Sequence, residues 1–300
     1  MKHKMIMENW RRYMREDVNP GFYLGDDGVP DWGKFRQKIE SLSKHLWVFF
    51  DTETTGLDAE LPHVQATQVA AVAYNTHGFS QMPEEVPNGQ FNMRLKLEPE
   101  TVEYMESEPE EYTDGGKTLK DLLKMTQYDS SEEAQAGFSD HPTVSKEFTD
   151  YLYRMKENSP SGKVILIAHN SPFDVRIMNA MYKKGEIDVP PVAVMDSLGV
   201  IDTYFKPILS RILYTRSNSA SPEERQIVQA LTAISRKGNK YIASKLGMLT
   251  TAFNIDNENW HEALADVRMT MEVLYNVVQY MDRRGKSHGK NRSWYRGHQK

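Results

Sequence analysis

Residues 46–58 read LWVFFDTETTGLD and carry the strongest structural signal in the chain. The apolar run at 46–50 predicts a buried strand. That strand ends on two carboxylates, Asp51 and Glu53, whose side chains share one face because side chains alternate along a strand. Two neighbouring carboxylates repel each other unless a cation or a shared proton lies between them. The pair therefore marks either the place where a strand reaches water or one half of a metal site.

The composition restricts the class of protein. The chain has 300 residues, 39% of them hydrophobic, which is enough for one large domain or two smaller ones. Its formal net charge of −5 creates no overall positive field for nucleic acid, so any such attraction must be local. The absence of cysteine excludes disulfides, thiolate metal sites and a cysteine nucleophile. Because there is no run of about eighteen apolar residues and no leader-like N-terminus, we expect a cytoplasmic protein with no membrane partner.

The periodicity of apolar residues predicts an α/β protein. Further strands are predicted at 65–74, 91–97, 163–168 and 192–195. Helices are predicted at 32–42, 148–155, 172–184, 240–246 and 260–282. Three strands in series, followed by alternating helices and strands, favour a mixed sheet flanked by helices.

Four stretches lie outside this pattern. Residues 1–45 are predicted to form a helical appendage outside the main core, which spans 46–282. The acid-rich stretch 98–142 predicts a largely solvated insertion with a short helix near 118–125. A second insertion, 205–240, is predicted to be helical with a polar break, and 283–300 form a basic C-terminal tail.

Two more acids adjoin core elements. Asp174 follows the strand at 163–168, in the first turn of a helix, and Asp266 lies beside the apolar stripe of the long helix, five residues after His261. Each has an ordinary interpretation: Asp174 as a helix cap, Asp266 as part of a wet helix face, and His261 as a cap or surface residue. Together with the pair on the first strand, they favour a site at the C-terminal edge of the sheet.

Three segments, FDTETTGL, HNSPFD and HEALADVRMT, resemble in their order and context the signature segments of the DEDDh exonucleases. This DnaQ-like superfamily includes the proofreading epsilon subunit of bacterial DNA polymerase III, ribonuclease T and the oligoribonucleases. A His five residues before the last Asp separates it from the DEDDy branch, which has a Tyr four residues before that Asp. The resemblance covers 46–282 and implies a ribonuclease H-like fold, with a mixed five-stranded sheet flanked by helices.

The resemblance also implies a role for each polar residue of the site. Asp51, Glu53, Asp174 and Asp266 would hold two divalent cations, Mg²⁺ or Mn²⁺, because hard cations prefer oxygen ligands. Asp51 would bridge both ions. His261 would act as the general base that takes a proton from the attacking water, a task suited to its ordinary pKa near 6.5.

Four further residues are candidate substrate contacts. By the same resemblance, backbone groups near Thr54 would meet the terminal 3′-hydroxyl, and Leu57 would wedge beside the last base. Leu57 could instead be an ordinary core residue. Asn170 and Phe173 could shape the turn that presents Asp174 more than they touch substrate. The implied reaction is 3′→5′ release of 5′-mononucleotides from single-stranded nucleic acid with a free 3′ end.

Several alternatives stay open at this level. DNA is the favoured substrate, but an RNA-trimming or oligoribonuclease-type activity fits the same motifs, as does a replisome-docking subunit with a polymerase partner in which hydrolysis is secondary. The tail, with Trp294 and Tyr295, is either a phosphate-binding and stacking segment or an ordinary charged terminus. Residues 7–16, MENWRRYMRE, resemble leaders of tailed-phage proteins and suggest a phage-encoded nuclease in a bacterial cytoplasm. The pathway and the oligomeric state are not specified by the sequence.

Overall fold

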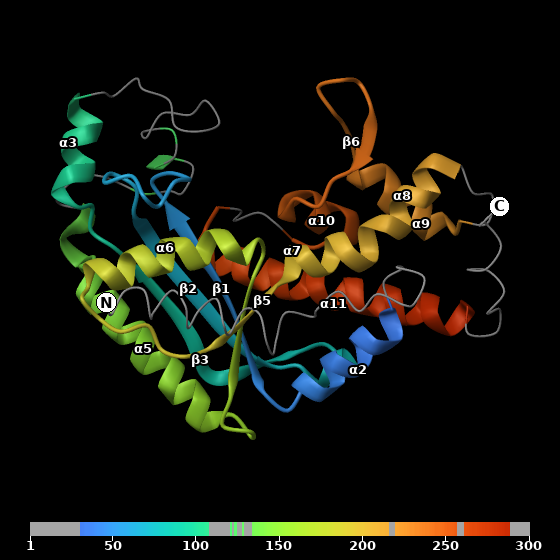
Figure 1. Cartoon of the computed structure of the whole chain (residues 1–300), viewed down its shortest axis with the longest axis horizontal. Coiled ribbons are helices and arrows are strands. Elements are labelled where there is room, and N and C mark those ends of the chain that lie inside the picture. Colours follow the sequence, from blue (N-terminus) through green and yellow to red (C-terminus); the bar gives the residue numbers. More distant parts are fainter. Residues whose placement is uncertain are drawn as a thin grey trace.

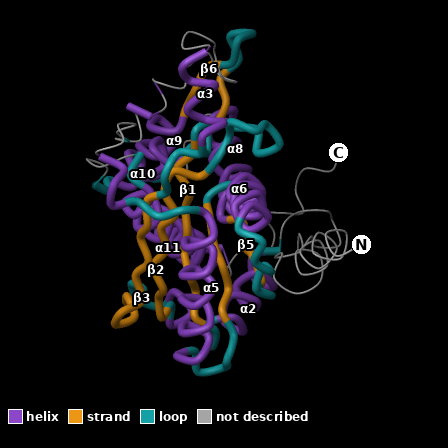
Figure 2. The backbone as a smooth tube through the Cα atoms, turned by 90° about the vertical axis from the view of Figure 1, so that its left-hand side faces the viewer, coloured by secondary structure: helices purple, strands orange, loops and turns teal. Residues whose placement is uncertain are grey.

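The computed structural model describes residues 31–288, except 108–120, 122, 125–127, 129–133, 216–219 and 257–260. Its centre is a five-stranded sheet in the order β3-β2-β1-β4-β5, with helices on both faces (Figures 1 and 2). The strands are β1 (Leu46–Thr54), β2 (Ala66–Asn75), β3 (Glu84–Arg94), β4 (Val164–Ala168) and β5 (Ala193–Asp196). The first three form an antiparallel meander, while β4 and β5 run parallel to β1. The predicted α/β class and mixed five-stranded sheet are confirmed.

Helices follow and connect these strands. The α-helices are α2 (Trp32–Leu42), α3 (Pro99–Ser107), α5 (His141–Asn158), α6 (Ser171–Lys184), α7 (Ser197–Val200), α8 (Lys206–Thr215), α9 (Pro222–Leu231), α10 (Leu246–Phe253) and α11 (Ala263–His288). Short 3₁₀ turns occur at His77–Phe79 and Ala134–Gly137, and a π-helical turn, Ile201–Phe205, joins α7 to α8. Within the described ranges, no helix is long and apolar enough to cross a membrane.

The apolar run of β1 is buried on both faces of the sheet. Trp47 and Phe49 face the larger core cluster, which includes side chains of α11. Val48 and Phe50 face the other cluster, which includes side chains of α5 and α6. Full burial of a large apolar side chain contributes about 1.5–3 kcal/mol relative to its exposure to water. The continuous apolar pattern of this strand is therefore explained by its central place in the sheet.

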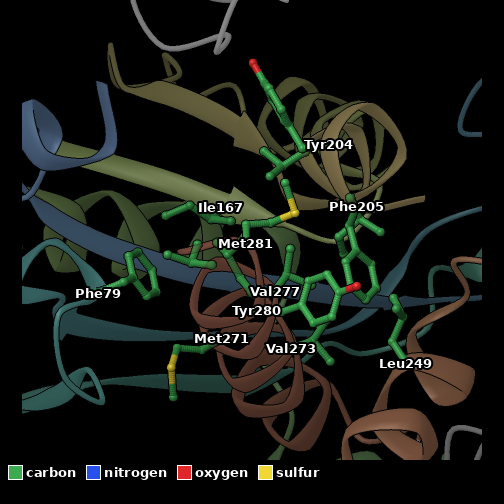
Figure 3. Close-up of a cluster of buried hydrophobic side chains, with 14 of the residues drawn as sticks. Phe79, Ile167, Tyr204, Phe205, Leu249, Met271, Val273, Val277, Tyr280 and Met281 are labelled. Atoms are coloured by element: carbon green, nitrogen blue, oxygen red, sulfur yellow. The ribbon is translucent and has the colours of Figure 1, made fainter. Parts of the chain in front are cut away.

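The long helix α11 packs along one face of the sheet through a stripe of apolar side chains. This stripe contains Val267, Met271, Leu274, Val277 and Val278, all buried. Figure 3 shows part of this cluster, in which Val277 and Tyr280 lie near Phe205 of the π-helical turn. The predicted helix at 260–282 is confirmed, although it begins at Ala263 and continues to His288.

Two strands are longer than the sequence indicates. β1 continues through both carboxylates to Thr54, and β3 begins at Glu84, seven residues before the predicted start at 91, and ends at Arg94. β3 is an edge strand with a register shift opposite Val72 and Tyr74. Edge strands and bulges tolerate the Pro and Gly residues that interrupt the alternating pattern there.

The two predicted insertions are more structured than expected. The first contains α3, whose Thr101 is fully buried, and residues Asp121, Leu123 and Lys124 are helical within the short helix predicted at 118–125. In the second, α8 and α9 confirm the helical prediction, but they are followed by a hairpin, β6 (Thr232–Ile234) and β7 (Lys240–Ile242). The rest of the 118–125 helix lies outside the described residues.

The predicted helix at 240–246 is wrong, because this segment forms β7 and the approach to α10. The hairpin turn explains the error. Gly238 has φ of +80°, and its N–H donates to the carbonyl oxygen of Ser235. Glycine enters this left-handed region without steric cost, so the Gly-Asn pair marks a hairpin turn here and not a helix start.

The helix α2 forms where predicted, but it does not lie outside the core. The Asp31 carboxylate accepts a hydrogen bond from the Lys34 backbone N–H at 3.0 Å and caps the helix. Phe35, Ile39 and Leu42 are buried in the larger cluster. The domain boundaries at 45 and 283 stay predictions. Residues 1–30 and 289–300, including Trp294 and Tyr295, lie outside the described residues.

Candidate metal centre

The end of β1 extends beyond its parallel neighbour. β1 pairs with β4 from Leu46 to Phe49 but with β2 as far as Thr54. Asp174 of α6 lies beside this extension, where its Oδ1 accepts hydrogen bonds from the backbone N–H of Thr52 at 3.1 Å and from the Thr52 hydroxyl at 2.8 Å. A side-chain carboxylate thus satisfies a backbone donor beyond the last β4 pair, and it fixes the start of α6 against the end of β1.

The turn before α6 is held by a second carboxylate. Asp196, the last residue of β5, accepts hydrogen bonds from the backbone N–H groups of Asn170 at 3.0 Å and Ser171 at 3.2 Å. Asn170 is in the left-handed conformation, with φ of 70°, and its side chain is exposed. Phe173 is half-buried and packs against the α5 and α6 side of the core. This turn positions Asp174 in the first turn of the helix.

Three carboxylates converge at the end of the central strand. Asp51 and Glu53 extend from β1 and Asp266 from α11, and each offers an oxygen within 4.8 Å of the others. Asp174 is not part of this group of three, although it lies next to it through Thr52. Residues from β1, α6 and α11 are therefore assembled as expected, with three carboxylates in the cluster and the fourth at its side.

One buried oxygen in this cluster lacks a hydrogen-bond partner. Asp266 Oδ1 is inaccessible to solvent and receives no hydrogen bond from the described residues. A buried carboxylate oxygen without a donor is costly unless a cation compensates it. An all-oxygen donor set of carboxylates is the set preferred by Mg²⁺ and Mn²⁺. The residues present therefore fit a divalent cation.

Burial and mutual repulsion raise the pKa values of the carboxyl groups, so these groups stay protonated at a higher pH than usual. Burial, followed by the charges of Asp174 and Glu53, raises the pKa of Asp51 well above its ordinary value. Burial and the nearby Asp266 raise the pKa of Glu53 to about 8. Burial also raises the pKa values of Asp174 and Asp266 to about 7. Without a cation the ionised cluster thus opposes folding.

These shifts predict a pH-dependent stability. A carboxyl group whose pKa is higher in the folded than in the unfolded state contributes less to stability as the pH rises from its unfolded-state pKa to its folded-state pKa. In EDTA, the free energy of unfolding should fall by about 1–2 kcal/mol between pH 7 and 8.5, because the folded protein still binds a proton at Glu53 that the unfolded chain has lost. Urea denaturation with and without 10 mM Mg²⁺, a concentration of about the saturating order for such sites, measures the effect.

Titration of the buried histidines does not contribute to this change in stability. Burial lowers the pKa of His141 and of His169, so their contributions to stability are complete above pH of about 6.5. Mg²⁺ should flatten the decline, because it stabilises the ionised carboxylates. A flat profile in EDTA, or an equal decline in Mg²⁺, contradicts the assignment of a repulsive cluster.

His261 lies beside the cluster, two residues before α11. Its side chain is half-buried, and its backbone is left-handed, with φ of 71°. Although burial is the main influence on the pKa of Asp266, a hydrogen bond from the His261 backbone N–H acts in the opposite direction. The histidine and the last aspartate of the motif are thereby connected directly through the backbone.

Two residues that sequence analysis missed hold this segment to the sheet. Gln68 of β2, paired in register with Glu53, donates from Nε2 to Glu262 Oε1 at 2.9 Å and to Asn92 Oδ1 at 2.8 Å. Glu262 Oε2 accepts from the backbone N–H of Ala265 at 3.1 Å and caps α11. A polar residue inside an otherwise apolar strand was the available signal for Gln68. The partnership with Glu262 is long-range and left no local signal.

The loop after β1 holds the two predicted substrate contacts, Thr54 and Leu57, in different environments. Thr54 is half-buried, and its hydroxyl donates to the carbonyl oxygen of Gly56 at 2.8 Å. Leu57 is 51% exposed, so its alternative assignment as a core residue is wrong. Thr55 is buried, and its hydroxyl bonds the His63 carbonyl oxygen at 2.8 Å, which closes the loop. Leu57 therefore presents an apolar side chain to solvent four residues after Glu53.

The mixed five-stranded sheet flanked by helices is the fold of solved exonuclease structures, as the resemblance of the three segments predicted. Among solved structures, the chain is similar to Escherichia coli exonuclease I in complex with a dT13 oligonucleotide, at a TM-score of 0.51 and 15% identity over 82% of this chain and 44% of that chain. It is equally similar to a zinc-ion-bound exonuclease I complex with single-stranded DNA, at a TM-score of 0.51 and 16% identity over 82% and 43%.

Sequence comparison identifies a further similar protein. The chain is 26% identical over 261 residues to the PolC-type DNA polymerase III of Latilactobacillus sakei subsp. sakei (strain 23K), covering 85% of this chain and 12% of that protein. No family model matches the sequence. The chain thus spans less than half of the exonuclease I chains and a small part of the polymerase.

Proposed function

We propose that this protein is a metal-dependent 3′→5′ exonuclease that degrades single-stranded nucleic acid, preferably DNA, to 5′-mononucleotides. The observation that carries the proposal is the convergence of Asp51, Glu53 and Asp266, with the unpartnered Asp266 Oδ1, at the end of the central strand. The preference for DNA is supported by the similarity to exonuclease I structures that contain a dT13 oligonucleotide and single-stranded DNA.

The carboxylates would hold two divalent cations, Mg²⁺ or Mn²⁺. Asp51, Glu53 and Asp266 would provide the converging oxygens, and Asp174 would add the fourth carboxylate. When bound, such cations lower the pKa of water and neutralise charge on the phosphate and the leaving oxygen. Thr52 orients Asp174 by occupying its Oδ1, which leaves the other oxygen of that carboxylate for a ligand.

His261 would accept the proton of the attacking water. A histidine suits this role because its ordinary pKa lies near neutral pH. The hydrogen bond from Gln68 to Glu262, the residue after His261, would keep the segment that bears His261 against the sheet. Gln68 and Glu262 are therefore positioning residues in this proposal, and His261 is the group that moves the proton.

The loop after β1 would receive the end of the substrate. Backbone groups at Thr54 would meet the 3′-hydroxyl, and the exposed Leu57 would stack beside the terminal base. An apolar wedge tolerates every base, because each base has an apolar face. Such a contact selects an unpaired end and explains why the proposed reaction proceeds from the 3′ terminus.

A side-by-side degradation assay tests this function. With Mg²⁺ or Mn²⁺, 3′-labelled single-stranded DNA should release labelled mononucleotide at once, whereas 5′-labelled DNA should give a ladder that shortens with time. A 3′-phosphorylated strand is the matched control, because it lacks the free hydroxyl. The proposal is wrong if neither DNA nor RNA is degraded, or if 5′-labelled strands lose their label first. Faster degradation of RNA favours the RNA-trimming alternative.

A polymerase or replisome partner is a second proposal, favoured by the match to PolC-type DNA polymerase III. The matched region is a small part of that protein, and in this proposal the chain would supply exonuclease activity to such a partner. A bacterial cytoplasm, with the gene of cellular or phage origin, would be the corresponding location. Co-purification with a replicative polymerase, tested with catalytically inactive protein, would separate a docking role from hydrolysis.

A further inference from the structure

A region of unbalanced positive charge surrounds the β6–β7 hairpin. From Arg225 to Ile255 the sequence contains five basic residues and no Asp or Glu, although the whole chain has a net charge of −5. Four of these basic residues lie in or directly after the hairpin: Arg236, Lys237, Lys240 and Lys245. The charge is therefore concentrated on one small part of the surface.

The side chains of these four residues are exposed and uncompensated. None of them forms a salt bridge with another residue in the part of the chain that the structure describes. Some other surface cations differ in this respect, since Lys206 pairs with Asp202 at 3.1 Å and Arg268 with Glu85 at 3.1 Å. A group of unpaired cations attracts a polyanion more strongly than a group already neutralised by carboxylates.

Large apolar side chains are exposed on the same hairpin. Ile234 is 68% exposed, Tyr241 is 41% exposed and Tyr214 of α8 is 66% exposed. The Tyr214 hydroxyl donates to the carbonyl oxygen of Lys240 at 2.5 Å, which holds this tyrosine against β7. Exposed aromatic rings among cations are typical of surfaces that bind single-stranded nucleic acid, where the rings stack on bases and the cations meet phosphates.

The base of the hairpin is fixed to the same edge of the sheet as the carboxylate cluster. The imidazole of His169, directly after β4, donates from Nε2 to the carbonyl oxygen of Ser244 at 2.9 Å. His169 lies five residues before Asp174, in the turn already described. The Ala243 N–H also donates to the Leu231 carbonyl oxygen at 2.8 Å and closes the hairpin base. The hairpin therefore begins at the edge of the sheet where the carboxylates gather.

From this base the hairpin projects away from the body of the molecule (Figure 1). Its turn at Gly238 is four residues from Ile242, which corresponds to a reach of about 13 Å at the rise of an extended strand. A strand whose 3′ end lies at the carboxylates could therefore pass along the hairpin with its preceding nucleotides.

We propose that the β6–β7 hairpin binds the segment of the single-stranded substrate on the 5′ side of the scissile bond. Arg236, Lys237 and Lys240 contact its phosphates, and Tyr241 stacks on a base. This inference rests on the proposed exonuclease function and extends it. An acidic centre repels a polyanionic substrate before cations are bound, and the hairpin offsets that repulsion where the strand approaches.

The test is the triple substitution Arg236→Gln, Lys237→Gln and Lys240→Gln. For an oligo-dT of about 20 nucleotides, which is several times longer than the hairpin at about 3.4 Å per nucleotide, the slope of the logarithm of the binding constant against the logarithm of salt concentration should become less steep by about 2. The KM for this strand should rise by about tenfold or more, while hydrolysis of a dinucleotide, too short to reach the hairpin, should be unchanged.

The matched control removes the same charge at the opposite end of the sheet. Lys44, Lys156 and Lys163 are exposed, and the carbonyl oxygen of Lys163 accepts from the backbone N–H of Leu46 at the start of β1. Lys44→Gln, Lys156→Gln and Lys163→Gln should leave the KM for the 20-nucleotide strand and the salt slope nearly unchanged. Tyr241→Ala separates the stacking contribution, because it should weaken binding without changing the slope.

Two results would overturn the inference. If the hairpin variant and the control weaken binding equally, the effect is one of total charge. If the hairpin variant binds the strand as well as the unsubstituted protein, the hairpin serves another partner, such as an acidic protein. Failure of the proposed function would look different: the unsubstituted protein would cleave no substrate, dinucleotide included, while the binding comparison would still decide the role of the hairpin.

Discussion

Asp51→Asn is expected to lower metal-dependent hydrolysis by about 10³-fold or more, while making the metal-free protein more stable. The loss follows because Asp51 supplies a charged oxygen at the centre of the carboxylate cluster, and a bound cation contributes several kcal/mol to such a reaction. The gain in stability follows because asparagine has nearly the same shape and carries no ionisable group, whose charged form burial and the neighbouring carboxylates disfavour at Asp51. Single-turnover rates and thermal unfolding in EDTA measure the two effects.

The opposite signs of these effects exclude a trivial explanation. Loss of folding would lower the rate and the stability together. Asp58→Asn is the matched control, because Asp58 is an exposed acid on the adjoining loop, where it accepts a hydrogen bond from the Glu60 N–H at 3.0 Å. It should change neither quantity appreciably. If Asp51→Asn keeps its rate, or if Mg²⁺ raises its melting temperature as much as that of the unsubstituted protein, Asp51 is not a metal ligand.

His261→Ala is expected to lower the rate by about 10²–10⁴-fold, the usual contribution of a general base. Metal binding should be retained, because the carboxylate cluster does not include this side chain. The Mg²⁺-induced rise in melting temperature should therefore match that of the unsubstituted protein. The pH profile of the residual rate should lose the limb that reflects ionisation of the histidine.

A second variant, His261→Asn, is the control for the left-handed backbone conformation at this position. His261 has φ of 71°, a left-handed conformation that alanine adopts at some cost and asparagine adopts more readily. His261→Asn should thus show the same loss of rate with less loss of stability. If either variant retains more than about a tenth of the rate, another group accepts the proton, since a general base contributes at least about 10²-fold.

The sequence predicts where the carboxylates gather because its signals are local. Asp51 and Glu53 end an apolar run, so alternation alone places both side chains on one face. Asp174 follows a continuous apolar strand, and parallel strands end at the same edge of a sheet. The placement of Asp266 could not be predicted in this way, since nothing local indicates which face of the sheet α11 covers. The resemblance of the three segments supplied that connection.

The features that could not be predicted depend on long-range contacts. The hydrogen bond of Gln68 to Glu262 joins residues 194 positions apart, so no local pattern indicates it. The burial of α2 follows from packing against α11 and the sheet, which its own amphipathic pattern does not specify. The wrong helix prediction at 240–246 had a local cause. The sequence contains a turn signal at Gly238, and in the structure this turn, and not the apolar spacing, determines the conformation.

The connection of Thr52 to Asp174 also has a consequence for the protein during its synthesis. It joins residues 122 positions apart, and the remaining carboxylate, Asp266, is translated later still. In a nascent chain β1 and β2 leave the ribosome long before α11, and domains generally fold as units. The chain cannot complete the carboxylate cluster until α11 has been made. Truncated products of interrupted translation would therefore carry an incomplete carboxylate cluster and, under the proposed function, no hydrolytic activity.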